Sequence, residues 1–422
     1  MPSIFSRTET VGRTAFDLYF GLEARYSEKF LYVERDDRIK VMGLGRVPID
    51  APVASLTPVR EGKVRRSPAL FSVGVFDPDD ARPANPLFAA LGGAEYVLPE
   101  VVVIEGGGKT FVQINGVTPV AASIPELLAS VPEACGQPTR DIDHTVIADD
   151  RDAWFRLVDE ALRRIRSGAL DKVVLARELR VETRESFSSR EMVANLRAAG
   201  VHGTLLLHEV DGVFFLGATP ELLVRKQGRE ITTMCLAGTT AVGESEEERV
   251  RGAVFLLGDE KNLREHAYVA DHLRGCLDEM CSKVRMPEGP SVLTLKHLQH
   301  LYTPVTAKVP RGVSLIDLRD RLHPTPALAG SPVDAARAAI RELEGFNRGL
   351  YGGTFGYVDL DGDGEFSVAI RSGVFTRDHG YVYAGCGIVE GSDPAAEYDE
   401  TAVKLKTILS AFRSTPSGRT DG

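Results

Sequence analysis

The stretch AGCGIVEGSDPAAEYDETAVKLKTIL, residues 384–409, joins a glycine-spaced strand to the last helix of the chain. Asp393 followed by Pro394 is typical of a helix start, because the carboxylate accepts backbone N–H bonds and proline fits the first turn. Gly385 and Gly387 come shortly before that start, where free backbone N–H groups can bind a carboxylate. The strand–turn–helix order is compatible with a mixed α/β protein, and this junction is a candidate ligand site.

The predicted helix, from about 394 to 412, carries a charged stripe. Glu397, Glu400 and Lys404 recur at i, i+3 and i+7 and therefore share one face. At about 100° per residue this face flanks the apolar stripe and does not oppose it. Two interpretations stay open, a solvated face with ordinary Glu–Lys pairs or a ligand site. The apolar stripe consists of Leu405, Ile408, Leu409 and Phe412.

Outward from this junction, the pattern alternates between strands and helices. Apolar residues at helical spacing predict helices over 149–168, about 259–282 and about 332–344. Strands and hairpins are predicted between them, with D-G at 211–212 as a turn signal. Residues 1–135 are predicted to form strands and tight turns, and a polar Pro- and Gly-containing stretch follows as an internal seam. The order indicates an α/β fold (α+β type) with large, mostly antiparallel sheets.

Composition limits the possible functions of this 422-residue chain. Fifty basic and sixty acidic residues give a net charge of −10, and no basic run favours nucleic acid or an anionic membrane as a partner. No stretch predicts a signal peptide or a membrane span. The five cysteines are scattered without metal-ligand spacing, so reduced thiols in a cytoplasmic protein are expected.

Two motif-like stretches are predicted to be hairpin turns. EGGGKT (105–110) resembles a phosphate-binding loop, but Val103 stands where its first glycine belongs and no helix follows. DLDGDGE (359–365) resembles a calcium loop, but Ile370 stands where that loop needs a bidentate acid.

Charged residues inside apolar segments are the remaining candidates for chemistry. Lys172 begins the apolar run VVLA, and Glu221 follows FFLGATP. In a desolvated cleft, burial lowers the pKa of a lysine and raises that of a glutamate, which supplies a base and an acid near neutral pH. Arg371 has the small and apolar neighbours of a carboxylate anchor. Glu265 lies at the edge of a helix stripe, where it could reach a magnesium ion, whereas His266 is expected in the core.

Together these segments resemble the chorismate-utilising enzymes, the family of isochorismate synthase, salicylate synthase and anthranilate synthase component I. The resemblance covers about 150 to the C-terminus, and residues 1–135 share only a loose β pattern. It implies one domain over 1–413 with two large sheets packed together and helices outside, and residues 414–422 are predicted to be a disordered tail. The matching stretches are KVVLAR, FLGATPELLVR, LAGT, REH, LQHLYTPV, LHPTPALAG, RGLYGG, VAIRSG and residues 384–409.

The resemblance also implies roles for individual residues. Lys172 matches the general base that activates water for attack at C2 of chorismate, and Glu221 matches the acid that protonates the departing C4 hydroxyl. Glu265 and Glu400 match direct Mg²⁺ ligands, with Glu397 nearby through water. The residues that match the substrate pocket are Tyr351 and Arg371 for the enolpyruvyl carboxylate, Gly385, Gly387 and Lys404 for the ring carboxylate, and His300 and Thr239 beside them.

Three positions bear on the choice within the family. Lys172 favours members that use water over members that use ammonia, so no amidotransferase partner is expected, and a monomer is predicted. Ala237 stands where members with a covalent route carry lysine. Ala327 stands where salicylate synthases tend to carry threonine, which favours a chain that stops at isochorismate.

Alternatives and departures remain at this point. Salicylate synthase activity and a catalytically silent homologue that binds a chorismate-like ligand are the alternatives. The pathway that would use the product, towards menaquinone, a catechol siderophore or salicylate, is open. Cys235 replaces the family's usual proline, and Asn262 replaces an acidic residue three positions before Glu265, which could weaken metal binding.

Overall fold

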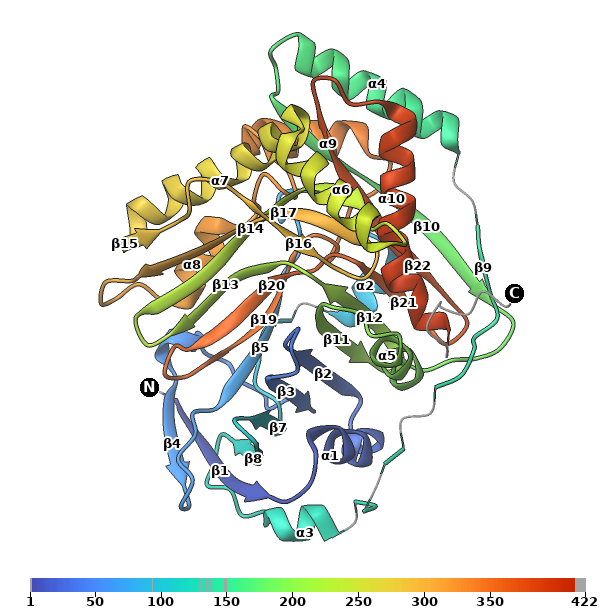
Figure 1. Cartoon of the computed structure of the whole chain (residues 1–422). Coiled ribbons are helices and arrows are strands. Elements are labelled where there is room, and N and C mark those ends of the chain that lie inside the picture. Colours follow the sequence, from blue (N-terminus) through green and yellow to red (C-terminus); the bar gives the residue numbers. More distant parts are fainter. Residues whose placement is uncertain are drawn as a thin grey trace.

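Two large β-sheets face each other and form the framework of the molecule (Figure 1). The structure, a computed structural model, describes residues 2–92, 94–129, 131–133, 135–136, 139–147 and 150–413. Among these residues the sheets have 13 and nine strands. The predicted tail 414–422 lies outside the described residues.

The 13-stranded sheet supplies one wall of the candidate site. Its order is β18 (Gly330–Ser331), β10 (Lys172–Thr183), β22 (His379–Val389), β21 (Ser372–Phe375), β12 (Val213–Thr219), β11 (Thr204–Val210), β2 (Glu28–Val33), β3 (Ile39–Leu44), β7 (Val101–Gly106), β8 (Lys109–Gly116), β1 (Ser3–Val11) and β4 (Thr57–Glu61), with β9 (His144–Val146) beside β10. Of the pairs described, β1 and β4 run parallel and the others antiparallel, which confirms the predicted fold class.

The nine-stranded sheet supplies the opposite wall. Its order is β15 (Ser282–Arg285), β17 (Leu298–Lys308), β14 (Glu230–Ala241), β13 (Leu222–Gln227), β20 (Gly364–Val368), β19 (Thr354–Asp359), β5 (Ala69–Val73) and β6 (Ala94–Val97), with β16 (Ser291–Thr294) beside β17. Strands from residues 1–135 therefore belong to both sheets. The polar stretch after residue 131 is consequently not a boundary between separate sheets.

Apolar side chains fill the space between the two sheets. Phe30 of the first sheet stacks on Phe71 of the second, with ring centroids 5.0 Å apart, and both rings are fully buried. Phe215 and Phe355 extend the same cluster from opposite sides. Burial of large aromatic side chains is a main source of folding free energy, so this layer holds the sheets together around the site.

Helices cover the outer faces of the sheets (Figure 1). Two further apolar clusters lie beneath them, and one includes Leu405 and Ile408 of the last helix. The helices are α1 (Ala15–Leu22), α2 (Pro86–Leu91), α3 (Ile124–Ala129), α4 (Arg151–Arg166), α5 (Ser189–Ala198), α6 (Glu246–Gly258), α7 (Glu260–Met280), α8 (Leu315–Leu322), α9 (Val333–Leu343) and α10 (Pro394–Leu409).

The predicted helices are present as α4, α7, α9 and α10. Asp150 caps α4 by accepting from the N–H groups of Asp152 and Ala153, and Asp149 lies outside the described residues. The prediction of only strands and turns over 1–135 is wrong at α2, at α3 and at α1. At the start of α1, Thr14 accepts the N–H of Asp17 as the cap. That helix is apolar on nearly every side because it is buried, and it therefore shows no amphipathic stripe.

Both rejected motifs are hairpin turns, as predicted. Gly107 and Gly108 connect β7 to β8 with positive φ angles of 60° and 73°, which glycine adopts without the clash of a Cβ atom. The second turn connects β19 to β20, and Asp359 accepts the backbone N–H groups of Asp361 and Asp363.

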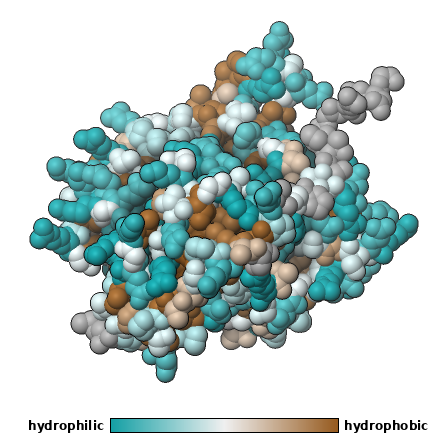
Figure 2. All heavy atoms as spheres, turned by 90° about the horizontal axis from the view of Figure 1, so that it is seen from below, coloured by the Kyte–Doolittle hydropathy of each residue, from teal (hydrophilic) through white to brown (hydrophobic). Residues whose placement is uncertain are grey.

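The surface is mixed in character. Seen from below, hydrophilic side chains cover most of the face, with smaller apolar patches between them (Figure 2). Among the described residues, no helix has both the length and the apolarity that crossing a bilayer requires. All five cysteines are free thiols, and three of them are buried.

Candidate active site

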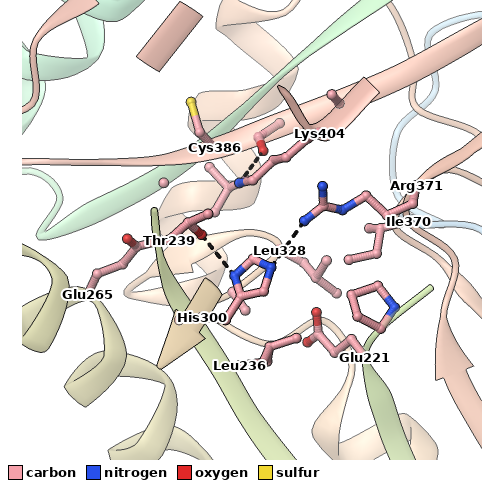
Figure 3. Close-up of a pocket in the computed structure, with 18 of the residues that line it drawn as sticks. Glu221, Leu236, Thr239, Glu265, His300, Leu328, Ile370, Arg371, Cys386 and Lys404 are labelled. Atoms are coloured by element: carbon pink, nitrogen blue, oxygen red, sulfur yellow. Dashed lines mark hydrogen bonds between the residues drawn. The ribbon is translucent and has the colours of Figure 1, made fainter. Parts of the chain in front are cut away.

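A cavity between the two sheets gathers most of the predicted site residues (Figure 3). Its walls come from β10 and β22 on one side and from β14 and β17 on the other, with α7 and α10 at its edge. The predicted residues that line it are Glu221, Thr239, Glu265, His300, Ala327, Tyr351, Arg371, Gly385, Gly387 and Lys404. Lys172 and Glu400 lie outside this lining and form ion pairs with the lining residues Glu265 and Lys404, whereas Glu397 pairs with Lys261.

Lys172 is fully buried at the start of β10. Its Nζ lies 3.1 Å from Oε1 of Glu265 on α7. Burial by itself raises the pKa of Glu265, but the ammonium groups of Lys172, Lys404 and a further lysine lower it below its ordinary value. Glu265 is therefore a carboxylate at neutral pH, although it is largely removed from solvent.

Gly387 makes this ion pair possible. It lies in β22, paired with Val174 of β10, and a Cβ atom there would come within 2.3 Å of Glu265 Oε1 and 2.8 Å of Lys172 Cε. At Gly385, two residues earlier, an added Cβ atom would lie 3.2 Å from the hydroxyl oxygen of Tyr351. The glycines therefore create space for the site from within a strand.

The prediction that free backbone N–H groups at the start of the last helix bind a substrate carboxylate is wrong. Gly385 and Gly387 belong to β22, and the carboxylate of Asp393 accepts the N–H groups of Ala395 and Ala396 at the start of α10. Because a residue of the helix itself satisfies these donors, any substrate carboxylate has to be held by side chains or by the strand.

Glu221 lies on the opposite side of the cavity (Figure 3). It follows β12, and Thr219 Oγ1 accepts its backbone N–H at 3.2 Å. Its side chain is buried, and burial raises its pKa to about 7, against the lowering effect of Lys172, Arg371 and Lys404. A carboxyl with this pKa is protonated in a large fraction of molecules near neutral pH, as a general acid requires.

A β-bulge aims Thr239 into the cavity. The pairing of β14 with β17 shifts between Leu236 and Thr239, and Gly238 adopts a φ of 81°. The Asn262 side chain accepts the N–H of Thr239 at 3.0 Å and donates to Asp259 at 2.7 Å. Asn262 therefore connects the bulge in β14 to the start of α7, because its amide supplies both an acceptor and a donor.

His300 is a buried neutral imidazole between Thr239 and Arg371 (Figure 3). Burial, and then the charges of Arg371 and Lys404, lower its pKa well below the ordinary value. Since a guanidinium only donates, Nε2 accepts from Arg371 at 3.5 Å, and Nδ1 carries the hydrogen that bonds Thr239 Oγ1 at 3.0 Å. The ring therefore presents a fixed tautomer to the cavity.

Arg371 is held in a strained backbone conformation. Its φ of 52° is uncommon for a residue other than glycine, and it turns the chain between β20 and β21 so that the side chain enters the cavity. Burial lowers its pKa to about 10, and Nη1 has no hydrogen-bond partner in the described part of the chain. A buried cation with unused donors fits an anion supplied by a ligand.

Tyr351 and Ala327 come from loops that an unpredicted residue, Arg348, holds in place. The ring of Tyr351 stacks on Tyr383 at 5.1 Å, and burial raises the pKa of its hydroxyl. Arg348 lines the cavity and donates to the carbonyls of Val174 and Leu328 at 2.7 and 2.9 Å. It pairs with the fully buried Glu344. The arginine in RGLYGG was the available signal for this clamp.

Each predicted metal-binding carboxylate contacts a lysine. Glu397 is bonded to Lys261 at 2.5 Å and Glu400 to Lys404 at 2.6 Å, in addition to the pair of Glu265 with Lys172. Among the described residues, no group of three or more His, Cys, Asp and Glu side chains is arranged to hold a metal ion. In this arrangement the three carboxylates are neutralised by ammonium groups.

The donor chemistry nevertheless fits a hard divalent cation. Glu397 is almost fully buried, so a solvated face is ruled out for this residue. Burial and the neighbouring Glu400 carboxylate raise the pKa of Glu397. Burial alone would lower the pKa of Lys261, but the carboxylates around it, Glu397 foremost, raise it. A cation near these oxygens would relieve the repulsion, and oxygen-only donors suit magnesium.

The remaining predictions at this site concern packing. His266 is a core residue as expected, with Nε2 2.8 Å from Thr303 Oγ1. Cys235 is fully buried behind the cavity lining, 3.5 Å from His266 Nδ1, and burial raises its pKa. Cys235 therefore fills space behind the cavity lining. Sequence reasoning missed Lys261, although it precedes Glu265 by one helical turn.

Comparison with known proteins identifies the class to which this fold and cavity belong. The chain belongs to the family described as chorismate binding enzyme, which it matches over residues 54–413. The match includes every predicted site residue.

Named relatives share a substantial part of the sequence. The isochorismate synthase MenF of Bacillus subtilis is 35% identical over 82% of this chain and 74% of its own length. The salicylate biosynthesis isochorismate synthase of Pseudomonas aeruginosa is 36% identical over 65% of this chain, and the alignment spans 58% of that relative.

Solved structures support the same fold. MenF, the menaquinone-specific isochorismate synthase of Escherichia coli, has a TM-score of 0.79 at 23% identity, covering 98% of this chain and 95% of that chain. Anthranilate synthase component I of Streptococcus pneumoniae has a TM-score of 0.66 at 21% identity, over 90% and 89% of the two chains.

Proposed function

We propose that this chain is a magnesium-dependent isochorismate synthase, which moves a hydroxyl group of chorismate from C4 to C2. The observation that carries the proposal is the fully buried Lys172, placed beside the cavity that Glu221 enters from the connection between β12 and β13. The relatives named isochorismate synthase support the same activity.

In the proposed reaction, a cation on Glu265 would take the place of the Lys172 ammonium group. Lys172, as a free amine, would then remove a proton from water as the water oxygen bonds to C2. The ring double bonds shift, the C4–oxygen bond breaks, and Glu221 donates a proton so that the hydroxyl leaves as water. One water enters and one leaves, so the reaction is an isomerisation. The raised pKa of Glu221 supports its role as the acid.

The charged groups of the cavity match the two carboxylates of chorismate. Arg371 has an unpaired Nη1 and lies in the same cavity as the hydroxyl of Tyr351, so these residues are proposed to bind the enolpyruvyl carboxylate. Lys404, near Gly385 and Gly387, is proposed to bind the ring carboxylate, with His300 and Thr239 beside it. Ala327 lines the same cavity and leaves space where a larger side chain would stand.

Magnesium is proposed to bind Glu265 and Glu400 directly and Glu397 through water, where it would neutralise the ring carboxylate and stabilise charge that develops on it. Three carboxylates, which offer oxygen donors, support this choice of metal. A monomeric, cytoplasmic enzyme without an amidotransferase partner remains our expectation.

Product analysis tests the proposal. Purified protein is incubated with chorismate and Mg²⁺, with and without an ammonium salt, and the products are separated by chromatography. The expected result is isochorismate in both conditions, without release of pyruvate in a coupled lactate dehydrogenase assay. Stoichiometric pyruvate would show a salicylate synthase, an aminated product would show an ammonia-using member, and an absence of turnover would show a silent homologue.

A further inference from the structure

Lys261 is the charged residue of the metal region that the proposed function leaves without a role. It lies in the first turn of α7, four residues before Glu265, and reaches across to α10. Its Nζ lies 2.5 Å from Oε1 of Glu397, whose side chain is only 2% exposed. A lysine in this position connects the two helices that carry the proposed metal ligands.

The carboxylates around Lys261 have few alternatives for neutralisation. Glu397 is close to Glu400, and the charge of Lys261 acts on Glu265 as well. Glu265 and Glu400 each have a lysine of their own, Lys172 and Lys404, which are already assigned to base catalysis and to substrate binding. Lys261 is therefore the counter-ion of Glu397 and belongs to neither of these roles.

We propose that Lys261 is a built-in competitor of the metal ion, which occupies Glu397 in the metal-free enzyme and thereby sets the affinity for Mg²⁺. The inference rests on the proposed function, because it assumes that Mg²⁺ binds among Glu265, Glu397 and Glu400. Lys261 thereby tunes the affinity for Mg²⁺ without being a ligand.

Both the charge of Lys261 and the space it occupies oppose a Mg²⁺ ion at Glu397. A metal-bound water that reaches Glu397 needs a carboxylate oxygen, and Lys261 holds one of the two. If the lysine stays, its positive charge opposes a divalent ion in a region shielded from solvent, where Coulomb interactions are strong. If it leaves, the ion pair with Glu397 has to be broken. Either course weakens Mg²⁺ binding, while the same pair stabilises the metal-free protein.

The test measures Mg²⁺ binding directly, without substrate. The metal-free full-length protein is titrated with magnesium chloride in a calorimeter, and its thermal unfolding is followed with and without Mg²⁺. Lys261→Met is compared with Lys261→Arg, which keeps the charge, and with Lys406→Met, which removes an exposed lysine of α10. We expect Lys261→Met to bind Mg²⁺ at least about tenfold more tightly. The Tm of the metal-free variant should be lower than that of the wild type. Addition of Mg²⁺ should raise the Tm of the variant by more than it raises the Tm of the wild type.

The outcomes separate this inference from the proposed function. Wild-type binding of Mg²⁺ with equal or weaker binding by Lys261→Met overturns the inference and leaves the metal site in place. If Lys406→Met binds Mg²⁺ more tightly to the same extent, the inference is also overturned, because the loss of any one positive charge would then explain the effect. No binding by either the wild type or Lys261→Met overturns the metal assignment and the inference together.

Discussion

Lys172 Nζ lies 3.1 Å from Glu265 Oε1, so the proposed catalytic base and a proposed metal ligand form one buried ion pair. The two residues come from different elements, the start of β10 and the second turn of α7. Gly387, across the strand pair, leaves the space in which they meet. A cation bound at Glu265 would therefore change the partner of Lys172, so the proposed metal site and the proposed base are neighbours in one ion pair.

Lys172→Met tests the base. The variant keeps an apolar stem of similar length in β10 but has no group that accepts a proton from water. We expect turnover of chorismate to fall by about 10² to 10⁴-fold, the usual contribution of general acid–base catalysis. Far-ultraviolet circular dichroism checks that the fold is retained. Unchanged turnover in a folded variant would remove Lys172 from the mechanism.

Glu221→Gln should separate activity from stability. The pKa of Glu221, about 7 in the folded protein, lies above its ordinary value of 4.5, so the folded state binds the proton more tightly than the unfolded chain. The unfolding free energy therefore falls as pH rises from about 4.5 to about 7, and the loss is complete above this range. Glutamine stays neutral and avoids this loss.

Denaturant unfolding measures this effect of Glu221→Gln. The variant should be more stable than the wild type by about 3 kcal/mol at pH 8, and the two should be equally stable near pH 4. Its turnover should be lost at every pH. In the wild type, kcat/KM should decline as pH rises through about 7, where the acid loses its proton. A variant that is less stable than the wild type at pH 8 contradicts the raised pKa.

Gly387→Ala tests the close packing behind the cavity. The added Cβ atom would stand 2.3 Å from Glu265 Oε1, which forces the carboxylate away from Lys172. We expect weaker Mg²⁺ binding by calorimetry and a large loss of turnover. Gly275→Ala is the matched control, because apart from the neighbouring backbone of helix α7 itself nothing lies within 4 Å of the new Cβ. The control should be more stable by about 0.5–1 kcal/mol and fully active.

Arg371→Lys tests whether the guanidinium shape matters as well as the charge. Lysine keeps the positive charge but cannot present two parallel N–H donors to a carboxylate. We expect KM for chorismate to rise by about tenfold or more, with a smaller change in kcat. Arg180→Lys, at a half-exposed position in β10 paired with Glu182, serves as the control. An unchanged KM would contradict the assignment of Arg371 to the enolpyruvyl carboxylate.

The sequence alone predicted the local elements that carry a clear repeat or cap. The Asp393–Pro394 start of α10, the helical spacing in α4 and α7, and the two glycine turns all depend on neighbours in the chain, and the structure confirms them. Family-like motifs also named the residues that the structure places around one cavity. The apolar helix α1 escaped notice because full burial removes its amphipathic pattern.

Only the tertiary structure decided how the charges are paired. Lys172 and Glu265 are 93 residues apart and Lys261 and Glu397 are 136 apart, so no local pattern links them. The same applies to Arg348, whose importance comes from carbonyls of two distant segments. Helix spacing and capping are short-range and can be read along the chain. The partner of a buried charge is selected by packing, because desolvation makes an unpaired charge costly wherever the fold places it.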